Sequence, residues 1–257
     1  MIVTTTSRPT AESVARARAV AEELGAAYAE RGDHSLARLR RRQSCDRLLI
    51  VSEREVRYDD GHAPPFFFHP SMALVRIKRL LAGERDTLVA VSGCRPGDVV
   101  LDCTAGMAAD AAVLAHAAGP GGRVTALESR QLPALLVREG LATYRTGLPA
   151  ADAALRRVTL RWCDHVDELR RLPADSCDIV YFDPMFRRPI HESSALQPLR
   201  PVADDRPLSP QAIAEARRVA RRVVVLKEHA ASGEFERLGF DVRAVNHANT
   251  AYGVIMP

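Results

Sequence analysis

The sequence predicts an α/β fold in which a doubly wound, mostly parallel sheet of seven strands ends in an antiparallel hairpin, preceded by a small α/β module. Three observations support this prediction. Short apolar runs alternate with segments of helical periodicity, an acidic residue ends each of four successive runs, and a loop of four residues separates the last two runs.

The first 65 residues predict the small module, with the order β-α-β-β. An apolar run at residues 2–6 is followed by Thr10, which is placed to cap a helix that ends near Gly25. Two short alternating runs, at residues 48–51 and 55–58, predict a hairpin. An Asp-Gly turn and two prolines then interrupt regular structure, so we expect the main domain to span residues 66–257.

Positive charge is concentrated in one short segment of this module. The formal net charge is +4, and only two of the 36 basic residues are lysines, a skew that a GC-rich genome also produces. Residues 36–42 contain four arginines. Two interpretations of this segment stay open: a solvated helix face, or a contact with an RNA backbone that binds phosphates without reading sequence.

An aromatic run, Phe66-Phe67-Phe68, leads into the main domain. Helical periodicity then covers residues 71–81 and 86–92, and a turn at residues 93–98 precedes the first strand of the main sheet. We interpret the aromatic run as packing between the two parts of the chain rather than as a platform for stacking bases.

The main domain is predicted to contain seven strands, with helical crossovers between the first five. Its opening unit is a strand at residues 99–102, a turn of small residues and an alanine-rich helix that stops near Gly119. This order predicts a Rossmann-like sheet, whose ligands bind beyond the carboxyl ends of the strands. The later strands are predicted at residues 123–128, 158–163, 177–183, 222–228, 240–246 and 251–256, with helices at 131–144 and 210–221.

Acidic side chains lie at or just past the carboxyl ends of the first four strands, namely Asp102, Glu128, Asp164 and Asp183. A single acid in such a place is most often a loop residue or a helix cap, whereas four in register indicate a binding edge. Glu128 ends the second strand, where a carboxylate accepts hydrogen bonds from both hydroxyls of a ribose. The pattern therefore predicts a cofactor that contains a nucleoside.

The turn after Asp102 is built from small residues. Small side chains let backbone N–H groups approach a ligand at the turn and at the N-terminus of the next helix. We therefore expect Asp102 and Gly106 to hold the cofactor together with Glu128 and Asp164.

The fourth strand ends in Asp183-Pro184-Met185-Phe186, which indicates the chemistry. Asp183 and a carbonyl at the rigid Pro184 turn are placed to accept hydrogen bonds from an exocyclic amine, and Phe186 to stack on its base. Accepting from the amine directs its lone pair at a methyl donor, so positioning does most of the chemistry. The alternative is an Asp-Pro turn that only caps local structure.

These motifs resemble those of class I S-adenosylmethionine-dependent methyltransferases, and more narrowly the bacterial small-subunit rRNA guanine-N2 methyltransferases. The resemblance covers residues 66–257 and implies S-adenosylmethionine as cofactor and an RNA base amine, flipped out or single-stranded, as acceptor. The segments that carry it are 102–107, 110–111, 127–128, 183–186 and 194–196, and uncharacterised relatives also share residues 68–70 and 76–80. The implied cofactor-binding residues are Asp102, Thr104, Ala105, Gly106, Met107, Glu128, Ser129 and Asp164, and the implied catalytic residues are Asp183, Pro184 and Phe186.

The chain departs from that family at two places. Phe186-Arg187 stands where the family has tyrosine and then proline, which bears on the identity of the acceptor base. Ala108 replaces the glycine expected in the first turn of the helix. Its Cβ lies near the expected ligand, and we expect a slightly shifted backbone to accommodate it.

A long insertion rich in arginine and proline, residues 187–209, follows the catalytic segment. A loop of this length beside an active site is usually a lid or a substrate-binding element. Arg187, Arg188 and Arg200 are predicted to bind the phosphates of the acceptor, or else they are ordinary surface charges. At the end of the fifth strand, Lys227 and Glu228 are expected to border the pocket.

Composition argues against several classes of protein. No apolar run approaches the roughly 20 residues that cross a bilayer, and the first residues lack the pattern of a secretory signal. We therefore expect a cytoplasmic protein with no membrane partner. The five cysteines form no C-x-x-C pair, so neither a metal site nor thiol catalysis is expected.

Together these observations predict an enzyme that transfers a methyl group from S-adenosylmethionine to an RNA base amine, with guanine N2 of small-subunit rRNA as the leading candidate and no metal required. Two alternatives stay open: a methyltransferase of DNA or of a small-molecule amine, and a protein that binds the cofactor without turnover. The sequence leaves the oligomeric state undetermined.

Overall fold

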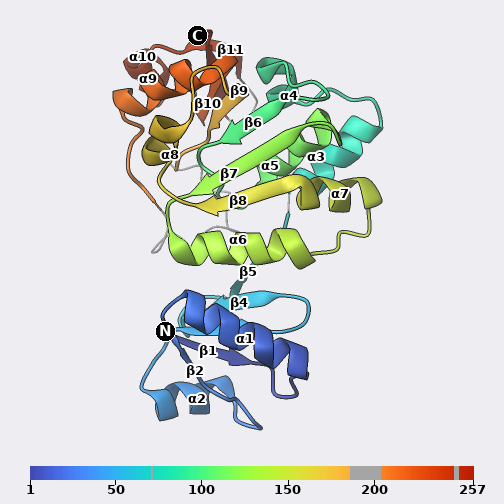
Figure 1. Ribbon diagram of the computed structural model, residues 1–257, viewed down its shortest axis with the longest axis vertical. Coiled ribbons are helices and arrows are strands. Elements are labelled where there is room, and N and C mark those ends of the chain that lie inside the picture. The colour runs from blue at the N-terminus through green and yellow to red at the C-terminus, as the bar shows by residue number, and fades with distance from the viewer. Residues whose placement is uncertain (71, 186–203, 246–248) are drawn as a thin grey trace.

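The structure, a computed structural model, describes residues 1–70, 72–185, 204–245 and 249–257. Over these ranges the chain forms a five-stranded sheet near one end of the molecule and a seven-stranded sheet in the larger part (Figure 1). One helix, α6 (Gln131–Thr143), lies between the two sheets. It therefore connects the small module to the main domain.

The smaller sheet has the strand order β2-β1-β3-β4-β5. Strands β1, β2 and β3 are parallel to one another, and β4 is antiparallel to both of its neighbours, β3 and β5. Thr10 caps α1 as predicted, because its side chain accepts a hydrogen bond from the Ser13 N–H at 3.3 Å. Strand β5 carries the sheet past residue 65, where we had placed the end of the module. Its elements are β1 (Ile2–Thr5), α1 (Ala11–Glu23), β2 (Ala27–Tyr28), α2 (Leu36–Gln43), β3 (Leu48–Val51), β4 (Val56–Asp59) and β5 (Phe66–Phe67).

Helices cover both faces of this sheet. Successive residues of a strand point to opposite faces, so Val3 packs with α1 whereas Ile2 packs with α2. The arginine-rich segment is thus an amphipathic helix: Leu39 of α2 is fully buried, and the helix covers the face opposite α1.

The larger sheet confirms the predicted fold class. Its order is β11-β12-β10-β9-β6-β7-β8. Strand β12 is antiparallel to both of its neighbours, β11 and β10, and the other neighbouring strands are parallel. The order reverses between β6 and β9, which is the point where doubly wound sheets bind ligands. The strands are β6 (Val99–Asp102), β7 (Arg123–Glu128), β8 (Val158–Trp162), β9 (Cys177–Phe182), β10 (Ala220–His229), β11 (Asp241–Val245) and β12 (Thr250–Ile255).

Helices form a layer on each face of this sheet. Along β6, Val100 packs into the core beneath α3, α5 and α7, and Leu101 into the core beneath α8, α9 and α10. No helix in the described ranges is long and apolar enough to cross a membrane. The remaining helices are α3 (Met72–Leu81), α4 (Thr87–Ser92), α5 (Ala109–Ala118), α7 (Pro149–Arg157), α8 (His165–Arg171), α9 (Pro210–Val219) and α10 (Glu234–Leu238).

Helix α6 belongs to both cores. Its Leu135 and Leu136 pack into the cluster that also contains Val3 of the smaller sheet, while its other side packs against the larger sheet. Gly140 leaves room for the Phe68 ring, because a Cβ at this position would lie 2.0 Å from the ring's Cγ. Two members of the aromatic run therefore pack as we interpreted the run from the sequence, Phe66 in the cluster of the smaller sheet and Phe68 in the core of the main domain, whereas Phe67 is exposed.

Candidate active site

The fold brings the four predicted acids to one edge of the larger sheet. Asp102 ends β6 and Glu128 ends β7, while Asp164 and Asp183 lie just past β8 and β9. These four strands are parallel neighbours, so their carboxyl ends point the same way. The sequence-based expectation of a shared edge is therefore met in space.

The loop after β6 is held between the two neighbouring strands. The Cys103 N–H donates to the Tyr181 carbonyl of β9 at 2.8 Å, and the Ala105 N–H donates to the Leu127 carbonyl of β7 at 2.8 Å. Gly106 follows, exposed and with φ +49°, and within the described ranges only one atom, the Thr104 carbonyl oxygen at 4.0 Å, comes near where its Cβ would be. The backbone at this glycine is therefore open to a ligand.

Ala108 shows how the chain tolerates the loss of the expected glycine. It keeps the left-handed conformation of a glycine, with φ 54° and ψ 25°, directly before α5. Its methyl group is buried in the core beneath α5. The Cβ thus packs inward, and its cost is backbone strain of about 1–2 kcal/mol rather than a blocked site.

Asp102 is a buried carboxyl group whose lost hydration is offset only in part by a hydrogen bond from the neighbouring backbone. Its Oδ1 accepts a hydrogen bond from the Thr104 N–H at 3.0 Å, and the side chain is almost fully inaccessible. Burial raises the pKa of Asp102 to about 8, because the charged form loses its hydration. A ligand that donates hydrogen bonds to this carboxylate would favour its charged form.

Glu128 is half-buried and presents its carboxylate at the same edge. Its Oε1 accepts from the Arg130 N–H at 2.9 Å. Burial raises the pKa of Glu128 above its usual value. The second oxygen has the acceptor chemistry that a pair of ribose hydroxyls requires.

Two other predicted cofactor residues, Ser129 and Asp164, already have partners from the segment that precedes α9. The Ser129 hydroxyl donates to Asp204 at 2.7 Å, and Arg206 donates to Asp164 at 2.8 Å. Asp164 also caps α8 through the Val166 N–H. Burial opposes it, but the hydrogen bond from Arg206 lowers the pKa of Asp164.

Asp183 is fixed through both its backbone and its side chain. Its N–H donates to the Thr104 hydroxyl at 2.6 Å, which connects the end of β9 to the loop after β6. Its Oδ2 accepts from the Lys227 Nζ at 2.7 Å. The pair forms because Leu226 and Phe182 are in register on adjacent parallel strands, so the residues that follow them are neighbours.

Lys227 leads into a buried network that the sequence analysis did not anticipate. Its Nζ also donates to Asp110 of α5 at 2.9 Å, and Asp110 accepts from the Tyr181 hydroxyl at 2.8 Å. Arg76 of α3 bonds both Asp110 and Asp86. A sequence signal did exist, because Asp110 is the one acid in an alanine-rich helix and Tyr181 lies within an apolar strand.

The network holds more negative than positive formal charge, since two cations face three carboxylates: Arg76 and Lys227 against Asp86, Asp110 and Asp183. Burial disfavours charge on each, but Lys227 and Arg76 lower the pKa of Asp110, and the carboxylates raise the pKa of Lys227. Burial raises the pKa of Asp183 to about 7. Among the described residues Lys227 is its one cationic partner, and the nearby Asp110 charge adds to the rise. Of the three carboxylates in this network, Asp183 is therefore more ready than Asp110 to accept a proton.

The remaining predicted site residues divide by position in the chain. Ala105 is buried, and Met107 is half-buried against two of the hydrophobic cores. Pro184 is described and half-buried, directly after Asp183. Four predicted residues lie outside the described residues, namely Phe186, Arg187, Arg188 and Arg200.

Comparisons with known proteins identify the family of the chain. A family model described as "Putative SAM-dependent methyltransferase" matches residues 37–235. Protein YpiP of Bacillus subtilis, whose own function is uncharacterised, is 39% identical over 254 residues, which cover 99% of this chain and 98% of YpiP. Ribosomal RNA small subunit methyltransferase J of Laribacter hongkongensis is 36% identical over 131 residues, which cover 50% of this chain and 45% of that protein.

The fold has a solved counterpart of similar extent. The crystal structure of an S-adenosylmethionine-dependent methyltransferase from Neisseria gonorrhoeae aligns with a TM-score of 0.59 and 17% identity, over 100% of this chain and 96% of that chain. At this identity the likeness concerns the fold. Together with the family match, it confirms the resemblance drawn from the sequence: the chain belongs to the S-adenosylmethionine-dependent methyltransferases, and S-adenosylmethionine is its cofactor.

Proposed function

We propose that the protein methylates an exocyclic amine of an RNA base, with guanine N2 of small-subunit rRNA as the target. The observation that carries the proposal is the Asp183 carboxylate at the edge of the sheet, followed by a rigid proline and next to the open turn at Gly106. An acceptor at this position suits an amine that donates hydrogen bonds while its nitrogen faces a methyl donor.

The residues at the edge fit the cofactor. In this proposal the open backbone at Gly106 approaches the amino-acid part of S-adenosylmethionine, and Glu128 accepts hydrogen bonds from the ribose hydroxyls. Asp102 orders the loop through the Thr104 N–H. Ala105, Met107, Ser129 and Asp164 complete the set, of which Ser129 and Asp164 share their polar groups with Asp204 and Arg206.

Bound S-adenosylmethionine supplies an electrophilic methyl group, which the base nitrogen accepts as it loses one N–H proton. Asp183 and the carbonyl at Pro184 accept hydrogen bonds from the amine, and the Asp183 carboxylate takes up the released proton. Its position in the network suits this role, because burial raises its pKa to about 7. We assign Phe186 to stacking on the base, and Arg187, Arg188 and Arg200 to its flanking phosphates, from the sequence alone.

The choice of rRNA is supported by the relatives. Ribosomal RNA small subunit methyltransferase J of Laribacter hongkongensis is similar to about half of this chain, and the match covers less than half of that protein. The experiment that tests the proposal maps methylated nucleosides in rRNA from a deletion strain and from its complemented control. We expect one N2-methylguanosine of the small subunit to be missing in the deletion strain. An unchanged rRNA profile would reject this target and favour DNA or a small-molecule amine.

A variant separates catalysis from cofactor binding. Asp183→Asn should slow methyl transfer by about 10²–10⁴-fold, because the amide takes up no proton. Its affinity for S-adenosylmethionine, measured by calorimetry, should stay within about tenfold of the unmodified protein, or roughly 1.4 kcal/mol. Asp241→Asn, at an exposed acid of β11, is the matched control and should change neither quantity. Loss of cofactor binding in Asp183→Asn would contradict the assigned role.

A further inference from the structure

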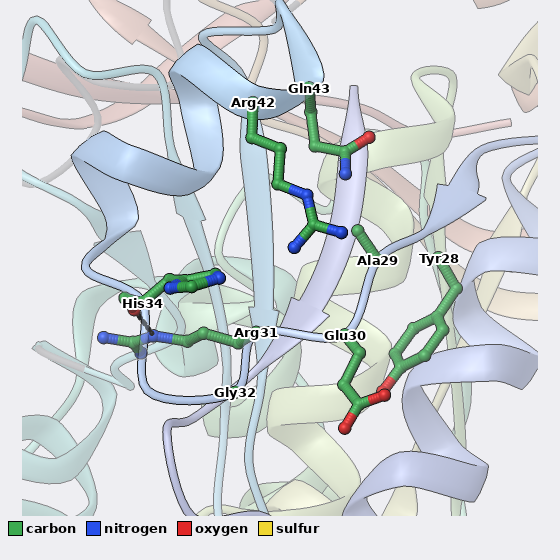
Figure 2. A pocket seen from close by; sticks show the side chains of 8 residues that line it. All are labelled: Tyr28, Ala29, Glu30, Arg31, Gly32, His34, Arg42 and Gln43. Atoms are coloured by element: carbon green, nitrogen blue, oxygen red, sulfur yellow. Dashed lines mark hydrogen bonds between the residues drawn. The ribbon is translucent and has the colours of Figure 1, made fainter.

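A hollow in the smaller part of the molecule lies outside the active site. It has a volume of about 270 Å³ and is lined by the segment that follows β2 and by the last turn of α2. In Figure 2, Arg42 and Gln43 extend into it from α2, and Arg31 and His34 line it from the other segment. Two guanidinium groups, an imidazole and an amide therefore border one small depression.

The hollow has hydrogen-bond donors to spare. Arg31 uses its Nε to bond the His34 carbonyl at 3.1 Å, which leaves its two terminal nitrogens for other partners. The side chain of Arg42 makes no ion pair or hydrogen bond within the part of the chain that the structure describes. One acid, Glu30, lines the hollow as well, but its side chain points away from Arg42 in Figure 2.

Helix α2 extends this positive surface along one face. Arg38, Arg41 and Arg42 are exposed and spaced i, i+3 and i+4, so they project from the same side of the helix. None of the three is in an ion pair with another described residue. Arg40 differs, because it pairs with Asp59 and donates to the Asp46 carbonyl at 2.9 Å.

The helix itself gains little from this arrangement. Arginines in a last turn complement the helix dipole, which accounts for Arg41 and Arg42 but not for Arg38. Like charges at i and i+4, as at Arg38 and Arg42, disfavour a helix by about 0.2–0.5 kcal/mol. An external anion would remove this repulsion, whereas Arg40 has its own partner within the fold.

We propose that the hollow and the Arg38–Arg41–Arg42 face form a second RNA contact, which binds backbone phosphates without reading sequence. The inference rests on the proposed function, because it makes RNA the substrate. Guanidinium groups bind phosphate oxygens in pairs, and phosphate contacts fix the position of a nucleic acid without selecting bases. Helix α2 covers the face of the small sheet opposite α1 and lies at the end of the molecule away from the larger sheet, so the RNA would span from the active site to this end (Figure 1).

Replacing the three arginines tests the contact. The variant Arg38→Gln/Arg41→Gln/Arg42→Gln keeps good helix formers at exposed positions, so the fold should persist. Binding of a fluorescein-labelled single-stranded RNA is measured as a function of salt. The plot of log K against log salt has a negative slope, and each lost phosphate contact makes it shallower by about 0.7. The loss of three contacts should therefore make it shallower by about 2. Both proteins lose affinity when salt is raised from about 50 to 200 mM, and the factor lost by the variant should be roughly 20-fold smaller than the factor lost by the unmodified protein.

A matched control separates this surface from net charge. Arg145→Gln/Arg171→Gln/Arg217→Gln removes three exposed arginines that lie outside the hollow and in no ion pair with a described residue. Its salt slope should equal that of the unmodified protein. Equal slopes for both variants would overturn the proposal. So would tighter binding of labelled polyglutamate than of RNA by the unmodified protein, because the surface would then fit an acidic protein.

Kinetics distinguish this inference from the proposed function. With rRNA as substrate, the α2 variant should raise KM and leave kcat unchanged at saturating RNA. If the unmodified protein methylates rRNA and the variant has the same KM, the second contact is wrong and the function stands. If the unmodified protein methylates no RNA, the function is wrong, and an unchanged salt slope would reject the contact on its own.

Discussion

Lys227 lies between two carboxylates, 2.9 Å from Asp110 and 2.7 Å from Asp183. Asp110 has a second cation in Arg76, whereas Lys227 is the one cation that pairs with Asp183 in the described part of the chain. At the scale of single residues, this asymmetry makes Asp183 the proton acceptor and Lys227 the residue that holds it ready.

The pH dependence of methyl transfer should report on this pair. Asp183 must be ionised to accept the amine proton, so kcat/KM should rise with pH through about 7. In Lys227→Met the lost cation should move the midpoint about 1–3 units higher, because a nearby positive charge lowers a carboxyl pKa by that amount. Lys227→Arg keeps a cation, so its midpoint should stay close to that of the unmodified protein. Lys78→Met, at an exposed lysine of α3, should leave the pH profile unchanged. An unshifted midpoint in Lys227→Met would exclude this role.

Asp102 should show a conflict between stability and binding. Its folded-state pKa of about 8 exceeds the usual value near 3.8, so its contribution to stability is present at low pH and is lost as pH rises towards 8. Asp102→Asn removes this loss. We therefore expect the Tm of the variant, relative to the unmodified protein, to increase between pH 5 and pH 8, while its affinity for S-adenosylmethionine falls. Thermal scans of both proteins measure this difference in Tm, with Asp241→Asn as the control. A difference, variant minus unmodified protein, that decreases from pH 5 to pH 8 would contradict the prediction.

At the scale of elements, the turn between β6 and α5 carries strain that its packing offsets. Ala108→Gly should relieve about 1–2 kcal/mol of left-handed strain but lose about 0.8 kcal/mol of methyl burial and some backbone entropy. The free energy of unfolding should therefore change by less than about 1 kcal/mol. Ala111→Gly, a buried position inside α5, lacks the strain and should cost about 2 kcal/mol. Urea denaturation compares the two, and an equal loss in both would show that Ala108 is unstrained.

The sequence predicted the elements that have strong local signals. The seven strands of the larger sheet follow apolar runs, and the Thr10 cap follows from its residue type. The strands β2 and β5 were missed because each has only two residues, too few for an alternating pattern, and β2 also pairs with the distant β1. Helix α8 was missed because it is short and polar. Helix α7 was missed although it carries a local signal, namely a proline in the first turn, four alanines and two arginines in the last turn.

The same reasoning explains the site. The acids at the strand ends could be predicted, because parallel strands bring their carboxyl ends to one edge. The partners of Asp183 could be predicted only in part: Lys227 was expected at the pocket, but its bond to Asp110 joins residues 117 positions apart. No local pattern encodes such a contact, because it depends on how α3 and α5 pack on the sheet.

At the scale of the whole molecule, the smaller sheet shares a hydrophobic cluster with α6 of the main domain. Leu135 and Leu136 of α6 pack with Val3, and Arg16 of α1 pairs with Glu139 of α6 at 2.6 Å. A shared core of this kind should couple the unfolding of the small module to that of the main domain. A division of the chain at residue 65 would then cut off β5 (Phe66–Phe67) from the smaller sheet and would not separate two folding units.

Calorimetry tests this coupling. We expect one unfolding transition with equal calorimetric and van't Hoff enthalpies, and Leu136→Ala should lower its free energy by about 2–5 kcal/mol without splitting it. Met72→Ala, at an exposed position of α3, should change stability by less than about 0.5 kcal/mol. Two separate transitions in the unmodified protein would mean that the sheets unfold independently.

The scarcity of lysine gives the Lys227 pair a practical consequence. The sequence offers amine-directed reagents only two side chains, Lys78 and Lys227. Lys78 is exposed, whereas the carboxylates of Asp110 and Asp183 hold Lys227 in its protonated, unreactive form. Acylation at Lys227 therefore records each opening of the ion pair. The molecule thus carries its own chemical reporter, read by mass spectrometry without an added label.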